Sequence, residues 1–162
     1  MIPQLPIRSR LIVISAMPAL LTLALLAACS PSEEEAPAAE TPSAEQALDT
    51  TTMTRSPEGI YHRVLQEGTG EAAATGQLAT VHYTGWLMSG EQFDSSRGGR
   101  PYYFRIGQGD VIQGWDMGVV GMKVGERRQM VIPPELGYGD ADLGVIPPNS
   151  PLVFSIELIS LD

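Results

Sequence analysis

The sequence is poor in the residues on which covalent and metal-dependent catalysis rely. It has a single cysteine, Cys29, and two histidines, His62 and His82. One cysteine excludes an intramolecular disulfide, and the chain shows no Ser-His-Asp set, Cys-His pair or cluster of metal ligands. His82 alternates to the strand face opposite Tyr83. We therefore expect His82 to be structural and His62 to lie on the surface.

Positive charge is also scarce. The chain has ten Lys and Arg residues against 19 Asp and Glu residues, a formal net charge of −9. All the acidic residues follow Cys29, whereas Arg8 and Arg10 precede it. Such a chain lacks the basic surface that nucleic acids require and the polybasic segment that binds anionic lipid. Its 162 residues leave room for one domain of ordinary size.

A long apolar run extends from Leu11 to Leu26, behind Arg8 and Arg10. This pattern is typical of a secretory signal rather than of a membrane-spanning helix. The run ends in Leu26-Ala27-Ala28-Cys29, which resembles the bacterial lipobox, whose cysteine is acylated and becomes the mature N-terminus. We expect residues 1–28 to be a lipoprotein signal peptide and Cys29 to carry the lipid. An uncleaved anchor helix with an incidental cysteine is the alternative.

The lipobox resemblance implies a lipid-anchored membrane protein that faces the periplasm. Ser30 follows the cysteine, whereas an aspartate there would resemble the inner-membrane retention signal, so the outer membrane is favoured in a Gram-negative cell. Residues 29–56 are rich in Ala, Pro, Glu, Ser and Thr and lack the apolar surface that folding requires. They are expected to form a disordered tether. The alternative is that the acidic run Glu33–Glu35 recruits a partner.

Residues 57–162 alternate apolar and polar side chains in segments separated by glycine and proline, which is typical of β-strands. In the last segment Phe154, Ile156 and Leu158 share one face, and Ser155 lies on the other. Strands are expected over five segments: Ile60–Gln66, Leu78–Leu87, Tyr102–Ile106, Glu126–Ile132 and Leu152–Leu161.

One short helix is expected over residues 114–122. Trp115, Val119 and Met122 follow the helical spacing i, i+4 and i+7 and form one apolar stripe. Gly125 then ends the turn. Many strands with one short helix predict an α+β domain, in which an antiparallel sheet wraps around the helix.

Five motifs in one order distinguish this domain. They are Val81-His82-Tyr83-Thr84-Gly85, Phe93-Asp94-Ser95-Ser96, Val111-Ile112-Gln113-Gly114-Trp115, Gly137-Tyr138-Gly139 and Gly144-Val145-Ile146-Pro147-Pro148. In this order, over roughly residues 58–162, they resemble the FKBP-type peptidyl-prolyl cis-trans isomerases. The resemblance implies the same wrapped-sheet fold for residues 57–162.

The resemblance also implies an activity, rotation about X-Pro peptide bonds, here in exported proteins whose folding it would assist. The barrier of about 18–20 kcal/mol comes from the double-bond character of the C–N bond, so removing water from the amide and donating oriented hydrogen bonds lowers it. No nucleophile, metal or cofactor is needed. A non-catalytic FKBP-like binding or chaperone module is the alternative function.

The resemblance assigns a prolyl-binding floor to Trp115, a donor hydroxyl to Tyr138 and a substrate-binding backbone N–H to Ile112. Without the family, Trp115 could be a plain core residue and Asp94 a turn residue. The family resemblance instead matches Asp94 to a buried acid. The implied catalytic residues are Tyr83, Phe93, Asp94, Trp115 and Tyr138, and the implied substrate-binding residues are Tyr102, Phe104, Val111, Ile112, Val145, Ile146 and Phe154.

Two features depart from the usual pattern. The loop between Ser96 and Pro101 is one residue short, so either Arg97 or Arg100 could replace the family's arginine partner of Asp94, and the sequence does not decide between them. The stretch Asp140–Leu143 is also short and lacks the histidine often found at that edge of the site, so the peptide preference is not decided by the resemblance. The six residues 139–144 leave no room for an inserted chaperone domain. We expect a monomer that binds proline-containing polypeptides and is inhibited by the macrolides tacrolimus and rapamycin.

Overall fold

The structure is a computed structural model that describes residues 49–162. The predicted signal peptide, the lipid attachment site at Cys29 and most of the predicted tether lie outside these residues. Within the described range, no helix is long and apolar enough to cross a membrane.

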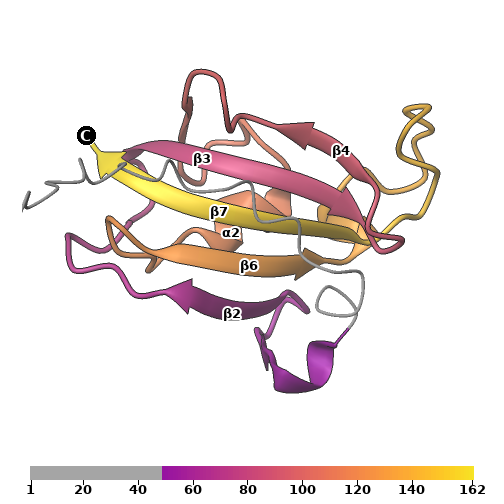
Figure 1. The fold of residues 1–162 in the computed structure, drawn as a ribbon, viewed down its shortest axis with the longest axis horizontal. Helices are drawn as coiled ribbons and strands as arrows, with labels where there is room; N and C mark the ends of the chain where they lie inside the picture. The colour runs from indigo at the N-terminus through magenta and orange to yellow at the C-terminus, as the bar shows by residue number, and fades with distance from the viewer. Residues whose placement is uncertain (1–48) are drawn as a thin grey trace, which may run out of the picture. The chain divides into compact units, whose positions relative to one another are not determined.

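The described residues form one antiparallel sheet in the order β1-β2-β6-β7-β3-β4, and β5 also pairs with β3 (Figure 1). The two longest strands, β3 and β7, pair from Ala79 opposite Leu161 to Leu87 opposite Leu152, with one bulge, and lie in the middle of the sheet. The strands are β1 (Thr54–Arg55), β2 (Tyr61–Gln66), β3 (Leu78–Leu87), β4 (Gln92–Ser95), β5 (Tyr102–Arg105), β6 (Arg127–Ile132) and β7 (Leu152–Leu161).

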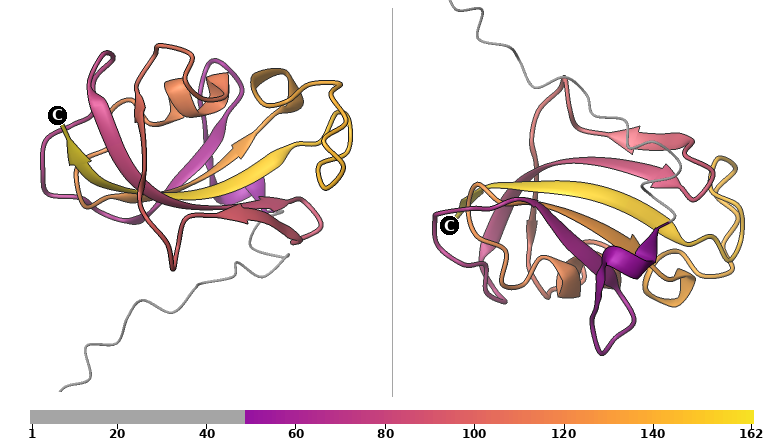
Figure 2. Two further views of the ribbon diagram at one scale, coloured as in Figure 1. Left: turned by 90° about the horizontal axis from the view of Figure 1, so that it is seen from above. Right: turned by 60° about the horizontal axis from the view of Figure 1, so that its bottom comes forward.

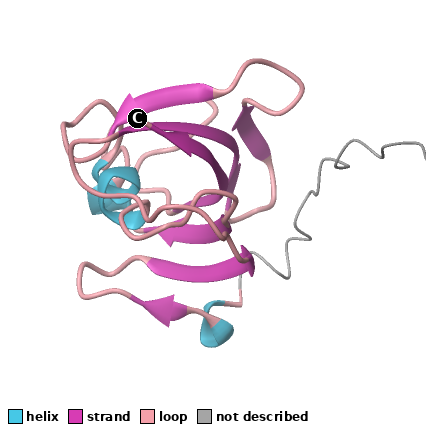
Figure 3. Ribbon diagram, turned by 90° about the vertical axis from the view of Figure 1, so that its left-hand side faces the viewer, coloured by secondary structure: helices cyan, strands magenta, loops and turns pink. Residues whose placement is uncertain are grey.

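A short helix, α2 (Gln113–Gly118), lies on one face of this sheet, which curves around it (Figures 2 and 3). Single 3-10 turns occur at η1 (Thr50–Thr52) and η2 (Pro134–Leu136). The helix ends four residues before the predicted end, and Gly121 then adopts a positive φ of 79°. Val119 and Met122 are nevertheless fully buried. The predicted apolar stripe is therefore present, but its last part lies on a turn.

Gly114 and Gly118 allow the helix to approach the sheet closely. A Cβ on Gly114 would lie 2.4 Å from Ile132, and one on Gly118 would lie 2.4 Å from Met130. Larger residues would push α2 off β6. Glycine lowers helix propensity, so the helix depends on this packing.

The main core fills the space between the sheet and α2. It takes one face of each strand, as period-2 alternation requires: Val81 from β3, Ile132 from β6, and Phe154, Ile156 and Leu158 from β7. This confirms the predicted face of the last strand and the predicted α+β fold, an antiparallel sheet wrapped around one short helix.

The opposite face of the sheet carries a second, smaller core. Trp86, Val131 and Val153 are buried there, and Met53 and Tyr61 pack against them, together with Met88. The chain from Thr50 to Arg55 is therefore ordered, because Met53 packs on this cluster and Arg55 pairs with Tyr61 in the sheet. The tether was predicted to be disordered up to residue 56; ordered chain instead begins before it.

Strand β4 was not predicted. Its four residues, Gln92–Ser95, contain the first three of the motif Phe-Asp-Ser-Ser, which is turn-like chemistry from sequence alone. They form a strand because they pair with β3, with Thr84 opposite Ser95 and Gly85 opposite Asp94. Tertiary pairing here overrides local preference.

Candidate active site

A cavity of about 490 Å³ opens on the α2 side of the sheet. Nine of the predicted site residues line it, together with Asp110, which was not predicted. The lining residues are Tyr83, Phe93, Asp94, Tyr102, Asp110, Val111, Ile112, Trp115, Tyr138 and Phe154.

Trp115 forms the inner wall of the cavity, where aromatic rings surround it. It is 4% exposed, and its ring lies 4.9 Å from that of Tyr83 and 5.2 Å from that of Phe154, both edge to face. Phe104 packs against it at 5.6 Å. Such edge-to-face contacts stabilise and fix ring positions. Trp115 is therefore both a core residue and a cavity residue, so the two interpretations are compatible.

Gly85 makes room for two of these rings. A Cβ at this position would lie 2.6 Å from Phe93 Cζ and 2.8 Å from Phe154 Cε1. The rings of Phe93 and Phe154 meet there at 5.6 Å, edge to face. The glycine of the His-Tyr-Thr-Gly motif thus gives two rings of the cavity wall their room.

Tyr83 and Asp94 form a hydrogen-bonded pair at the cavity's edge. The pairing of β3 with β4 brings them together, and the Tyr83 hydroxyl donates to Asp94 Oδ2 at 2.5 Å. Asp94 Oδ1 accepts from the Ser95 N–H at 2.8 Å. Burial, followed by the hydrogen bond to Asp94, raises the pKa of Tyr83 well above its ordinary value. The Tyr83 hydroxyl therefore stays protonated, and its proton is used in the hydrogen bond to Asp94.

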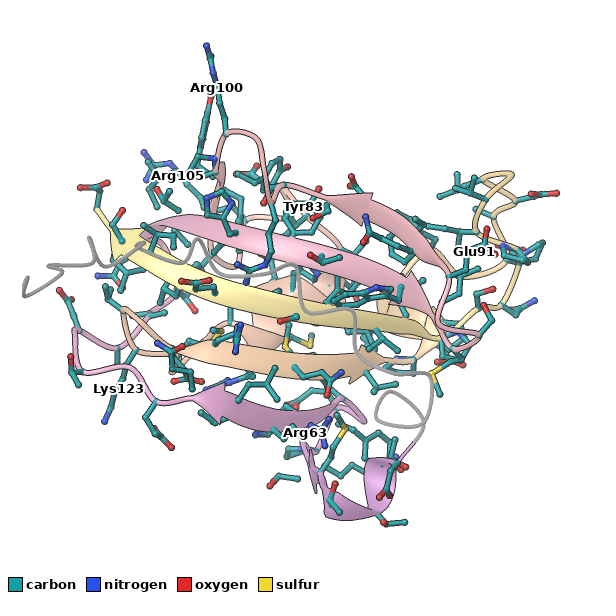
Figure 4. All side chains as sticks on the ribbon, in the orientation of Figure 1. Arg63, Tyr83, Glu91, Arg100, Arg105 and Lys123 are labelled. Atoms are coloured by element: carbon teal, nitrogen blue, oxygen red, sulfur yellow. The ribbon has the colours of Figure 1, made fainter. Side chains whose placement is uncertain are left out.

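Asp94 differs from the buried acid that the family resemblance implied, because it is exposed. It lies on β4, the strand at the end of the sheet, where no further strand of residues 49–162 covers it. Neither proposed arginine partner contacts it. Arg97 forms an ion pair with Glu157 at 2.9 Å, and Arg100 extends away from the sheet at the tip of its loop (Figure 4). Hydrogen-bond donors, not an arginine, satisfy this carboxylate.

Tyr138 lies on the other side of the cavity, on the loop after η2, and is 41% exposed. Burial, then the negative charge of Asp94, raises its pKa, so the hydroxyl stays protonated at neutral pH. This hydroxyl makes no hydrogen bond to another residue of the range 49–162, which leaves its proton available to a ligand. Ile112, the N-cap of α2, lies at the edge of the same cavity. Amides at the start of a helix have no intrahelical acceptor.

Three predicted substrate-binding residues do not line the cavity. Phe104 and Ile146 are buried in the main core, 2% and 5% exposed, and Phe104 supports Trp115 from behind. Val145 is 62% exposed on the loop before β7. Both histidines are also outside the cavity; His82 Nδ1 lies 3.1 Å from Ser96 Oγ, consistent with a structural role.

Sequence reasoning missed two acidic residues near this cavity. Asp110 lines it, and its Oδ2 accepts from the Arg105 N–H at 3.1 Å. Asp116 accepts two backbone N–H groups of the loop that precedes α2. The available signal was the run Gly107-Gln108-Gly109-Asp110, whose glycines and aspartate predict a tight turn.

Comparison with known proteins agrees with this architecture. Residues 69–159 match the FKBP-type peptidyl-prolyl cis-trans isomerase family. The FK506-binding protein of Neisseria meningitidis serogroup B is 49% identical over 105 residues, covering 64% of this chain and 96% of its own. FK506-binding protein 4 of Mycosarcoma maydis is 41% identical over 110 residues, 68% of this chain; this chain spans only 29% of that longer protein.

A solved structure shares the fold as well as the sequence. The crystal structure of AtFKBP13 superposes with a TM-score of 0.63 at 43% sequence identity, covering 68% of this chain and 98% of the other. The family match covers more than half of the chain, and the Neisseria protein, 49% identical, is covered to 96% of its length. The chain belongs to the FKBP-type peptidyl-prolyl cis-trans isomerase family.

Proposed function

We propose that this isomerase places a prolyl ring on Trp115, with the preceding amide between the Ile112 N–H and the Tyr138 hydroxyl. The observation that carries this proposal is the cavity of about 490 Å³ lined by aromatic rings, with a free hydroxyl donor at its edge. In this proposal the aromatic walls exclude water from the bound amide, and the two donors hydrogen-bond to its carbonyl group.

The site has to lower the isomerisation barrier by only a modest amount. Uncatalysed X-Pro exchange takes about 100 s, so a turnover of about 10 ms needs four decades, or roughly 5.5 kcal/mol of barrier. Desolvation weakens the resonance that keeps the amide planar, and one or two oriented donors stabilise the twisted form. No bond is broken, so no nucleophile is involved.

The two tyrosines have different roles in this proposal. Tyr83 donates to Asp94, so its proton is committed and its ring serves as a wall. Tyr138 keeps its proton for the substrate carbonyl. The pair Tyr83–Asp94 holds the wall in place through two strands that meet only in the folded sheet.

Proline-containing polypeptides are the substrates, and the macrolides tacrolimus (FK506) and rapamycin are expected inhibitors. The names of the relatives, FK506-binding proteins, support macrolide binding. A ligand of this kind would compete with the prolyl ring for Trp115. We further propose that the chain acts as a monomer.

We also propose that the domain works at a membrane, on exported proteins. The support lies in the sequence alone: a signal-like apolar run that ends in a lipobox-like Leu26-Ala27-Ala28-Cys29. A lipid-modified Cys29 would hold the domain at the periplasmic side, with the outer membrane favoured in a Gram-negative cell. Cys29→Ser should release the protein into the soluble fraction, whereas continued membrane association would exclude the lipid anchor.

One reaction distinguishes catalysis from the alternative, a non-catalytic binding or chaperone module. Residues 29–162 with Cys29→Ser are added to a protein whose refolding is limited by proline isomerisation. Acceleration that tacrolimus abolishes is expected. Peptide binding without acceleration would favour the alternative. Only Tyr138 and the few residues up to Val145 form the loop beside the cavity, which leaves no room for a separate chaperone domain there.

A further inference from the structure

One carboxylate joins helix α2 to the loop that precedes it. Asp116, on α2, accepts the Gly107 N–H at 2.9 Å through Oδ1 and the Gly109 N–H at 2.9 Å through Oδ2. Both oxygens are used, and both partners are backbone amides nine and seven residues earlier in the chain. The side chain is half-buried.

The loop needs such an anchor because its backbone is unusual. Gly107 and Gly109 have positive φ angles of 75° and 77°, a region that other residues rarely adopt. The two left-handed glycines turn their N–H groups toward the same point, where the carboxylate lies. Ionised acceptors make stronger hydrogen bonds to backbone amides than neutral ones do.

This loop leads directly into the active site. After Gly109 the next three residues, Asp110, Val111 and Ile112, all line the cavity. Asp116 itself follows Trp115 on the helix. Its carboxylate therefore fixes the distance between two parts of the site, the Val111–Ile112 edge and the Trp115 wall.

We propose that Asp116 is a positioning residue for the isomerase reaction. By holding residues 107–109 on α2, it keeps the Ile112 N–H at the point where a substrate carbonyl binds above Trp115. This role depends on the proposed use of the Ile112 N–H. Asp116 touches no substrate; it acts through the loop.

A simpler role must be separated from this one. Asp116 lies in the first turn of α2, where a negative charge stabilises a helix by about 0.3–1 kcal/mol. That effect needs the charge but not two aligned oxygens, and it would alter stability without altering substrate binding. The test therefore needs a readout of the loop and of the site, besides stability.

The experiment compares Asp116→Ala, Asp116→Asn and Asp116→Glu with the parent chain, residues 29–162 with Cys29→Ser. Asp49→Ala is the matched control, because the Asp49 carboxylate also accepts a backbone N–H, that of Thr51 at 3.0 Å, at the first turn, η1. For each variant kcat and KM on a proline tetrapeptide, amide hydrogen exchange over residues 107–112 and the melting temperature are measured.

Asp116→Ala should raise KM about tenfold, equivalent to 1.4 kcal/mol, with kcat changed less than about twofold and faster exchange at residues 107–112. Asp116→Asn, which keeps one acceptor, should fall between Ala and the parent, and Asp116→Glu should recover most of the loss. Asp49→Ala should leave KM and this exchange unchanged. If Ala does not fold, the near-isosteric Asn variant decides.

Three results would overturn the proposal. Unchanged exchange would mean that the carboxylate does not hold the loop. Faster exchange with a parental KM would mean that the loop does not position the site. An equal rise in KM in Asp49→Ala would mean that the effect comes from a general loss of stability. An inactive parent chain would instead contradict the proposed function, and the exchange data would still show whether Asp116 holds residues 107–109.

Discussion

Gly85→Ala provides a strict test of how the cavity is built, because the structure specifies where the new methyl group would go. It would lie 2.6 Å from Phe93 Cζ and 2.8 Å from Phe154 Cε1. Carbon atoms pack best at about 3.5–4.0 Å, so both rings must move away from the new methyl group, by roughly 1 Å. Behind both rings lies the sheet; in front lies the cavity.

The overlap has a predictable cost. Forcing an extra methyl group into a packed core destabilises a protein by about 1–3 kcal/mol. If the rings move into the cavity instead, stability is largely retained and the space for the prolyl ring shrinks. Both outcomes lower catalytic efficiency, and we expect a fall of at least tenfold in kcat/KM, measured with a proline tetrapeptide alongside the free energy of unfolding.

Gly99→Ala is the matched control. Its Cβ would meet only the Ser96 carbonyl oxygen, at an ordinary 3.5 Å, so stability should change by less than about 0.5 kcal/mol and kcat/KM should not change. If Gly85→Ala is as stable and as active as Gly99→Ala, the rings do not form the walls of the working site and the reasoning fails.

Two further predictions concern the tyrosines. Tyr138→Phe should slow isomerisation tenfold or less, about 1.4 kcal/mol, because the dry aromatic walls remain; complete loss in the same peptide assay would give the hydroxyl another role. Burial raises the pKa values of Tyr83 and Tyr138, so their contribution to stability is fully present below the ordinary tyrosine pKa of about 10 and is lost as pH rises above it. The melting temperature should therefore fall between pH 9 and pH 11, and less steeply in Tyr83→Phe; a flat profile in the parent would contradict this assignment.

The sequence predicted most of the sheet and most of the cavity. Strands Leu78–Leu87 and Leu152–Leu161 have the predicted bounds, because long alternating segments with one buried face carry a strong period-2 signal. The motifs of β3 and β4 meet because these strands pair in the sheet, and residues of α2 and of the loop after η2 line the same cavity. The roles assigned to the site residues remain predictions.

What the sequence did not predict depends on contacts between distant segments. Strand β4 and the exposure of Asp94 follow from pairing at the end of the sheet, and the order at Met53 follows from its packing on the small core of Trp86, Val131 and Val153. The helix α2 ends early, at Gly118, and a turn with a left-handed Gly121 then carries the apolar stripe onward to Met122. Asp116 belongs to none of the five sequence motifs, and only the fold places its carboxylate against two glycine amides.

The central claim is that the X-Pro peptide bond rotates while its prolyl ring packs on Trp115 in an aromatic cavity that excludes water. Magnetisation-exchange NMR on a proline tetrapeptide measures this most directly, when combined with the indole N–H resonance of Trp115. The account predicts accelerated cis–trans exchange together with a shift of that resonance, both removed by tacrolimus. Accelerated exchange with an unshifted Trp115, or a shifted Trp115 without acceleration, would contradict it.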